Sequence, residues 1–68
     1  MPYVNIKVTP EGVTPEAKAK LIAGVSMLLE DVLDKPPSIT FVTVDVVETE
    51  DWGVGGLPVH EYRRRTAQ

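Results

Sequence analysis

Residues 14–37 read TPEAKAKLIAGVSMLLEDVLDKPP, and this stretch decides the fold. Thr14 is a residue type that caps the start of a helix, and Pro15 suits the first helical position. A residue before a proline is pushed out of the helical region, so Lys35-Pro36-Pro37 is expected to end the helix. Between these signals, apolar residues recur at three- and four-residue steps: Ala17, Leu21, Ile22, Val25, Leu28, Leu29, Val32 and Leu33. The stripe is broad, as in a helix that is covered on more than one side.

The segments on both sides of this helix have the pattern of β-strands. Residues 3–9 alternate, with Val4, Ile6 and Val8 on one face, and residues 39–47 are rich in β-branched side chains. A strand, a helix of about five turns and a second strand predict a right-handed β-α-β unit with parallel strands. The fold class is therefore α/β.

The remaining residues predict a short C-terminal β-ribbon. Residues 48–51 are expected to form a polar loop or a single helical turn, and Gly53-Val54-Gly55-Gly56 a ribbon with a glycine turn. Residues 57–62 are expected to add a short strand or arm, in which His60 and Tyr62 share one face. A solvated Arg-rich tail follows, and residues 1–68 make one domain.

The size of the chain points to oligomerisation. A chain of 68 residues buries only about 60% of its unfolded surface, and small domains usually need disulfides, metals or partners. There is no cysteine and only one histidine, His60, which argues against disulfides and a zinc site. Two strands are also too few to stand alone. We expect other copies to complete the sheet, and Gly24 to permit close approach of another backbone.

The charge and hydropathy exclude several classes of protein. The net charge is −3, which argues against nucleic-acid binding. No apolar stretch reaches the ~18 residues of a membrane span, and no secretory signal opens the chain. We therefore expect a cytoplasmic protein.

Pro2 is the residue that most directly suggests chemistry. A small residue at this position favours removal of Met1, which would leave Pro2 with a free secondary amine able to act as a general base. If Met1 stays, the nitrogen is a tertiary amide without basicity. The alternative is structural, because a proline at the start of an edge strand costs nothing.

Two other groups of residues are better explained by structure than by chemistry. The glycine cluster 53–56 does not lie between a strand and a helix, and no Gly-Lys-Ser/Thr follows, so it is not a phosphate loop. The acids Glu48, Glu50 and Asp51 fit a solvated loop better than a metal site.

In order and spacing, these features resemble the 4-oxalocrotonate tautomerase family over nearly the whole chain. The matching residues are Met1-Pro2 opening a strand, Glu11-Gly12, Leu21-Ile22, Val25-Ser26, Leu33-Asp34-Lys35-Pro36, and Trp52 before Gly53-Val54-Gly55-Gly56. The resemblance implies dimers arranged as a hexamer and enol–keto proton transfer on a small enol or keto acid, with no cofactor. It also implies that Pro2 is the base and that Trp52 forms an apolar wall of the pocket.

The chain departs from the family at two positions. Family members commonly carry arginines that grip the substrate carboxylate where this chain has Val13 and Phe41. Phe41 would make the pocket more apolar, and the missing cation could be Lys7 or one of Arg63, Arg64 and Arg65. Lys7 could equally pair with Asp45. Two alternatives follow: a non-catalytic assembly or binding protein on the same scaffold, or Pro-dependent hydration, dehalogenation or decarboxylation.

Overall fold

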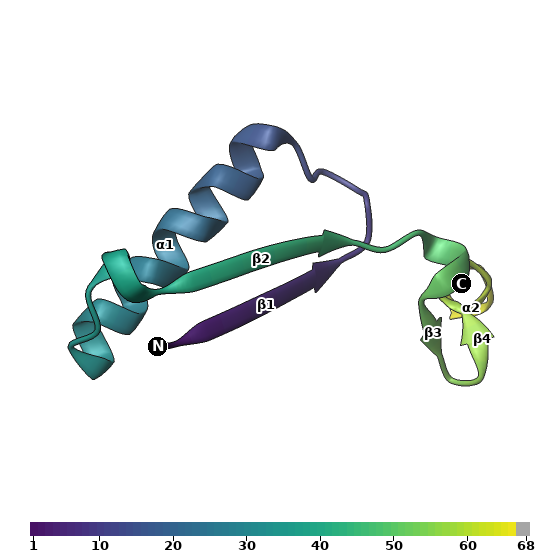
Figure 1. Ribbon diagram of the computed structural model, residues 1–68. Coiled ribbons are helices and arrows are strands. Elements are labelled where there is room, and N and C mark those ends of the chain that lie inside the picture. The colour runs from purple at the N-terminus through teal and green to yellow at the C-terminus, as the bar shows by residue number, and fades with distance from the viewer. Residues whose placement is uncertain (67–68) are drawn as a thin grey trace.

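A parallel β-α-β unit forms the N-terminal two thirds of the protein. The computed structural model describes residues 1–66, so the last two positions of the expected 1–68 domain lie outside the described residues. Strand β1 (Tyr3–Val8) leads to helix α1 (Pro15–Leu33) and strand β2 (Phe41–Val46), and the helix lies along one face of the pair (Figure 1). The strands run parallel, with Tyr3 opposite Phe41 and Val8 opposite Val46. The predicted unit is confirmed.

Helix α1 begins as predicted and ends earlier than predicted. The Thr14 hydroxyl accepts a hydrogen bond from the Ala17 N–H at 3.1 Å, and Pro15 follows as the first helical residue. At the other end Asp34 adopts a left-handed conformation with φ 57°, and its N–H donates to the Glu30 carbonyl at 3.0 Å. This left-handed residue closes the helix at Leu33, before the prolines can act.

The second strand is shorter than the predicted 39–47. Residues Pro37–Ile39 form a 3₁₀ turn, in which the Ile39 and Thr40 N–H groups donate to the Pro36 and Pro37 carbonyls at 3.1 Å each. These donors are not available to β1, so strand pairing starts at Phe41. At the far end, the Val47 N–H still donates to the Val8 carbonyl at 2.8 Å.

The C-terminal part contains the predicted ribbon and a helix that was not predicted. A 3₁₀ turn (Thr49–Asp51) precedes strands β3 (Gly53–Val54) and β4 (Leu57–Pro58), which pair antiparallel. Helix α2 (Val59–Thr66) then replaces the expected extended arm and solvated tail. His60 and Tyr62 therefore do not share a face, because residues two apart on a helix point in different directions. No helix within residues 1–66 is both long and apolar enough to cross a bilayer.

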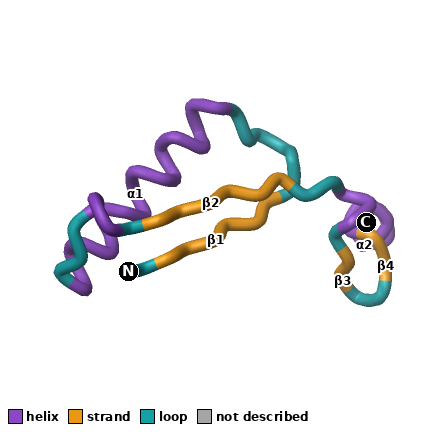
Figure 2. Tube along the Cα trace, in the orientation of Figure 1, coloured by secondary structure: helices purple, strands orange, loops and turns teal. Residues whose placement is uncertain are grey.

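The single chain is extended and has almost no core. The ribbon and α2 project beyond one end of the β-α-β unit (Figure 2), and the chain measures 44 × 23 × 20 Å. The radius of gyration of its Cα atoms is 15.4 Å, whereas a compact domain of this length would have about 11 Å. Val59, 6% exposed, is the one buried residue that residues 1–66 contain. The apolar side chains of α1 face strand β2 only in part, and Leu28 and Val32 are 58% and 69% exposed.

Candidate active site

A pocket of about 400 Å³ lies at the C-terminal end of β1, a size typical of small-molecule sites. It is formed by the end of β1, the turn that follows, Trp52 before the ribbon, and α2. Its lining residues are Lys7, Val8, Thr9, Glu11, Val13, Trp52 and Arg63. Three residues predicted to line a substrate pocket, Lys7, Trp52 and Arg63, are thus brought together from distant parts of the sequence.

Trp52 is held in the pocket wall by its backbone. It follows the 3₁₀ turn, and its N–H donates to the Thr49 carbonyl at 3.3 Å. Its own carbonyl accepts a hydrogen bond from the Val59 N–H at 2.7 Å, at the start of α2. The half-buried indole is therefore fixed between the turn and the helix.

An ion pair joins α2 to the turn after β1 across the pocket. Arg63 Nη1 lies 2.7 Å from Glu11 Oε1, and the Thr9 hydroxyl donates to the same oxygen at 3.1 Å. The bond from Arg63 is the main cause that holds the pKa of Glu11 below its ordinary value. Glu11 was read from the sequence only as part of a turn. No local signal could identify a partner 52 residues away.

The Glu11 carboxyl should titrate below its ordinary pKa of 4.5, and Arg63→Gln should move its midpoint up toward that value. Because the pKa of Glu11 is lowered in the folded protein, the stabilising pair is complete above the ordinary pKa and is lost as the pH falls through the lowered one. Carboxyl NMR shifts of Glu11 measured against pH test this. An Arg64→Gln variant is the control, and an equal rise in both variants would contradict the pairing.

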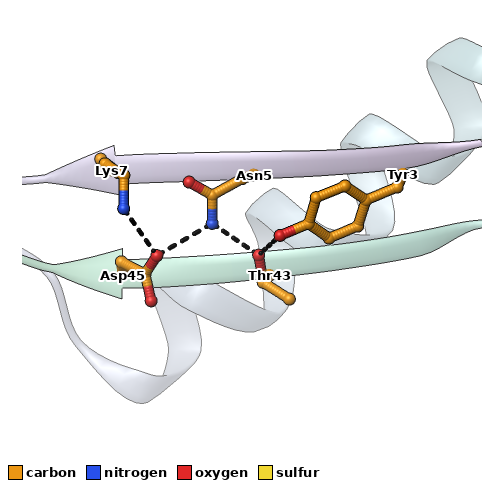
Figure 3. A network of polar contacts seen from close by, with 5 residues as sticks. All are labelled: Tyr3, Asn5, Lys7, Thr43 and Asp45. Carbon is orange, nitrogen blue, oxygen red and sulfur yellow. Dashed lines mark hydrogen bonds and ion pairs between the residues drawn. The ribbon is translucent and has the colours of Figure 1, made fainter.

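Lys7 belongs to a ladder of polar side chains on the sheet face away from α1 (Figure 3). Its Nζ lies 3.0 Å from Asp45 Oδ2, and the Asn5 amide donates to the same oxygen at 2.9 Å. The Asn5 amide also donates to Thr43 Oγ1 at 2.6 Å, which lies 3.1 Å from the Tyr3 hydroxyl. Hydrogen bonds from Asn5 and then Lys7 lower the pKa of Asp45. The expected alternative, a Lys7–Asp45 pair, is confirmed.

Pro2 and Phe41 lie at the opposite end of the sheet. The Phe41 N–H donates to the Pro2 carbonyl at 3.0 Å, and the Phe41 ring, 51% exposed, belongs to the same face as Tyr3. Five residue steps of extended strand, about 16 Å at ~3.3 Å each, separate Pro2 from Lys7. Within one chain, Pro2 and Phe41 therefore lie far from the pocket that contains Trp52.

Arg64 lies outside the pocket. It pairs with Glu61 on α2, and Arg65 Nε lies 3.3 Å from the same carboxylate. Hydrogen bonds from Arg64 and then Arg65 lower the pKa of Glu61. In the part of the chain that the structure describes, no three histidine, aspartate or glutamate side chains gather as metal ligands would.

Residues 2–62 match the family model described as tautomerase enzyme. The chain belongs to the tautomerase family. A probable tautomerase K2 from Dickeya dadantii is 52% identical over 98% of this chain and 100% of its own length. The crystal structure of DmpI from Helicobacter pylori has a TM-score of 0.87 and 43% identity, over 93% of this chain and 97% of its own.

A third similar protein is a heterohexamer 4-oxalocrotonate tautomerase from Chloroflexus aurantiacus. Its structure has a TM-score of 0.81 and 28% identity, over 93% of this chain and 100% of its own. The resemblance to 4-oxalocrotonate tautomerases stated from the sequence is thus confirmed, and so is the fold. This member of the tautomerase family is an enzyme of the tautomerase type.

Proposed function

We propose that this enzyme moves a proton between oxygen and carbon of a small 2-hydroxydienoate or 2-keto acid, with the free amine of Pro2 as the base. The observation that carries the proposal is the position of Pro2. Its carbonyl is held by the Phe41 N–H at 3.0 Å, so the backbone of Pro2 has a fixed place at the start of the paired strands. Removal of Met1 exposes that nitrogen and changes nothing else in the pairing.

The proton transfer balances without a co-reactant. The amine of Pro2 takes the proton from the enol oxygen, the electron pair closes the carbonyl, and the double bond delivers its electrons to carbon. The prolinium then returns its proton to that carbon, which leaves the keto product and the free amine. An amine does this near neutral pH when apolar surroundings disfavour its cation, as Phe41 and a tryptophan would.

The distance between Pro2 and the Trp52 pocket supports a working site that is built from more than one copy. A small acid cannot touch Pro2 and Trp52 of the same chain across about 16 Å of strand. Pro2 and Phe41 of one protomer would therefore meet the Trp52 pocket of another. A hexamer assembled from dimers is our proposal for this arrangement, supported by the heterohexamer described for the similar Chloroflexus aurantiacus protein.

Intact-mass measurement of the native protein, combined with an ultraviolet assay of two enols, tests the reaction. We expect a mass without Met1 and ketonisation of phenylpyruvate enol and 2-hydroxymuconate at least about a hundredfold above buffer, the range of positioned acid–base catalysis. A processed protein that ketonises neither compound would contradict the proposal. Hydration, dehalogenation or decarboxylation, or a non-catalytic assembly, would then become the better hypothesis.

A further inference from the structure

Glu11 is paired with Arg63 inside the pocket. It is the acidic side chain among the seven lining residues, and it faces Arg63 from the turn on the other side of the pocket. One hydrogen bond, from Nη1 to Oε1 at 2.7 Å, joins the two side chains. A guanidinium can donate two parallel hydrogen bonds to one carboxylate, in a bidentate arrangement. The Arg63–Glu11 pair has one such hydrogen bond.

The second cation of the pocket, Lys7, is paired with a residue that does not line the pocket. Lys7 Nζ is 3.0 Å from Asp45 Oδ2, and Asp45 is further held by Asn5 at 2.9 Å. Arg63 is the cation whose own partner, Glu11, also lines the pocket, whereas Asp45 does not. The remaining wall is apolar, from Val8, Val13 and Trp52. These groups suit a flat, largely apolar body with one carboxylate.

We propose that Glu11 is an internal counter-ion that the substrate's carboxylate displaces from Arg63, and that this exchange makes monocarboxylates bind more tightly than dicarboxylates. The inference rests on the proposed function, because it assigns the substrate class of the same site. The ligand's carboxylate accepts two hydrogen bonds from the Arg63 guanidinium, and the flat body of the ligand lies against Trp52. A second carboxylate on the ligand would meet the displaced Glu11, whose charge opposes it.

The exchange is energetically feasible because the Glu11–Arg63 pair is open to water. Glu11 and Arg63 side chains are 52% and 53% exposed, and pairs of this kind are weak. A released Glu11 keeps its bond from the Thr9 hydroxyl and regains water. The bound ligand gains a bidentate contact and apolar surface in return.

Trp52 is the sole tryptophan of the chain, so its fluorescence reports binding at this pocket without any turnover. The probes are phenylacetate and 4-carboxyphenylacetate, which differ by one carboxylate and carry no keto group. We expect the assembled, processed protein to bind phenylacetate more tightly. Glu11→Gln should raise phenylacetate affinity about two- to fivefold, the strength of an exposed pair expressed as a ratio. Arg63→Gln should lower it about fivefold or more, and the double variant should match Arg63→Gln alone.

Two further variants make the test decisive. Glu16→Gln removes the same charge from the exposed first turn of α1 and should leave the affinity unchanged. Glu11→Asp keeps the charge but shortens the side chain, so it should raise the affinity by breaking the pair alone. Affinity that is unchanged in the Glu11 variants, or equal in Glu11→Gln and Glu16→Gln, overturns the proposal. Failure of Pro2 as the base would appear in turnover and leave these binding results intact.

Discussion

Protein that retains Met1 should have no enol–keto activity, and Pro2→Ala should lose most of it. In the first case the nitrogen of Pro2 is an amide and cannot accept a proton. In the second, a primary amine replaces the ring nitrogen and differs in basicity and position. We expect kcat to fall about a hundredfold or more in each case, the contribution of a positioned base. Ultraviolet assays on phenylpyruvate enol with protein of verified intact mass measure this.

Two controls separate chemistry from folding in that experiment. Circular dichroism and light scattering should show the same secondary structure and assembled size for the Pro2 variant as for the parent. Trp52→Ala should raise the pKa seen in the pH–rate profile, because water then solvates the cation. Turnover by the Met1-retaining protein at the parent rate would exclude the amine as the catalyst.

Leu28→Glu should dissociate the assembly and unfold its subunits. In the single chain Leu28 is 58% exposed and Val32, one turn later, is 69% exposed. A monomer would therefore tolerate a glutamate at position 28. If a second copy covers this side of α1, the substitution removes apolar burial and buries an unpaired charge, a loss of at least about 3 kcal/mol per subunit. Gly24 lies one turn before Leu28 on the same side of α1. A Cβ atom placed on it would have no neighbour within 4 Å, so this side of the helix is uncovered in the single chain.

Light scattering and thermal unfolding measure the Leu28→Glu effect, and Ala23→Glu is the matched control. Ala23 is exposed and lies five residues earlier, so at ~100° per residue its side chain points well away from Leu28. The control adds the same charge and should keep the size and melting temperature of the parent. An assembly of unchanged size in Leu28→Glu would show that this side of α1 is not an interface.

The correctly predicted parts of the fold are those that depend on interactions between residues close together in the sequence. The Thr14 cap, the Pro15 start and the alternation in β1 each depend on contacts a few residues apart, and all three are present. The early end of α1 depends on a left-handed Asp34, a conformation that no local pattern requires of an aspartate. Helix α2 was missed because a run of arginines after Glu61 reads equally well as a solvated tail.

Three of the residues predicted for the site lie in one pocket, and their arrangement there was not predicted. Lys7, Trp52 and Arg63 do gather in one pocket, since a parallel unit brings the end of β1 close to the segment after β2. The Glu11–Arg63 pair spans 52 positions and depends on how α2 folds back, which local sequence does not determine. The roles of Pro2, Phe41 and Arg64 remain predictions.

The near absence of a core has a consequence for the life of the protein in a cell. A chain in which only Val59 among residues 1–66 is buried has little native structure to protect it when it leaves the ribosome. If other copies cover its apolar surface, as proposed above, a chain that has not yet met them is exposed to proteases, whose action competes with association. The amount of enzyme should therefore rise more steeply than the rate of its synthesis. At low expression most chains would be degraded before they associate, whereas at high expression newly made chains would find partners quickly and most would escape degradation.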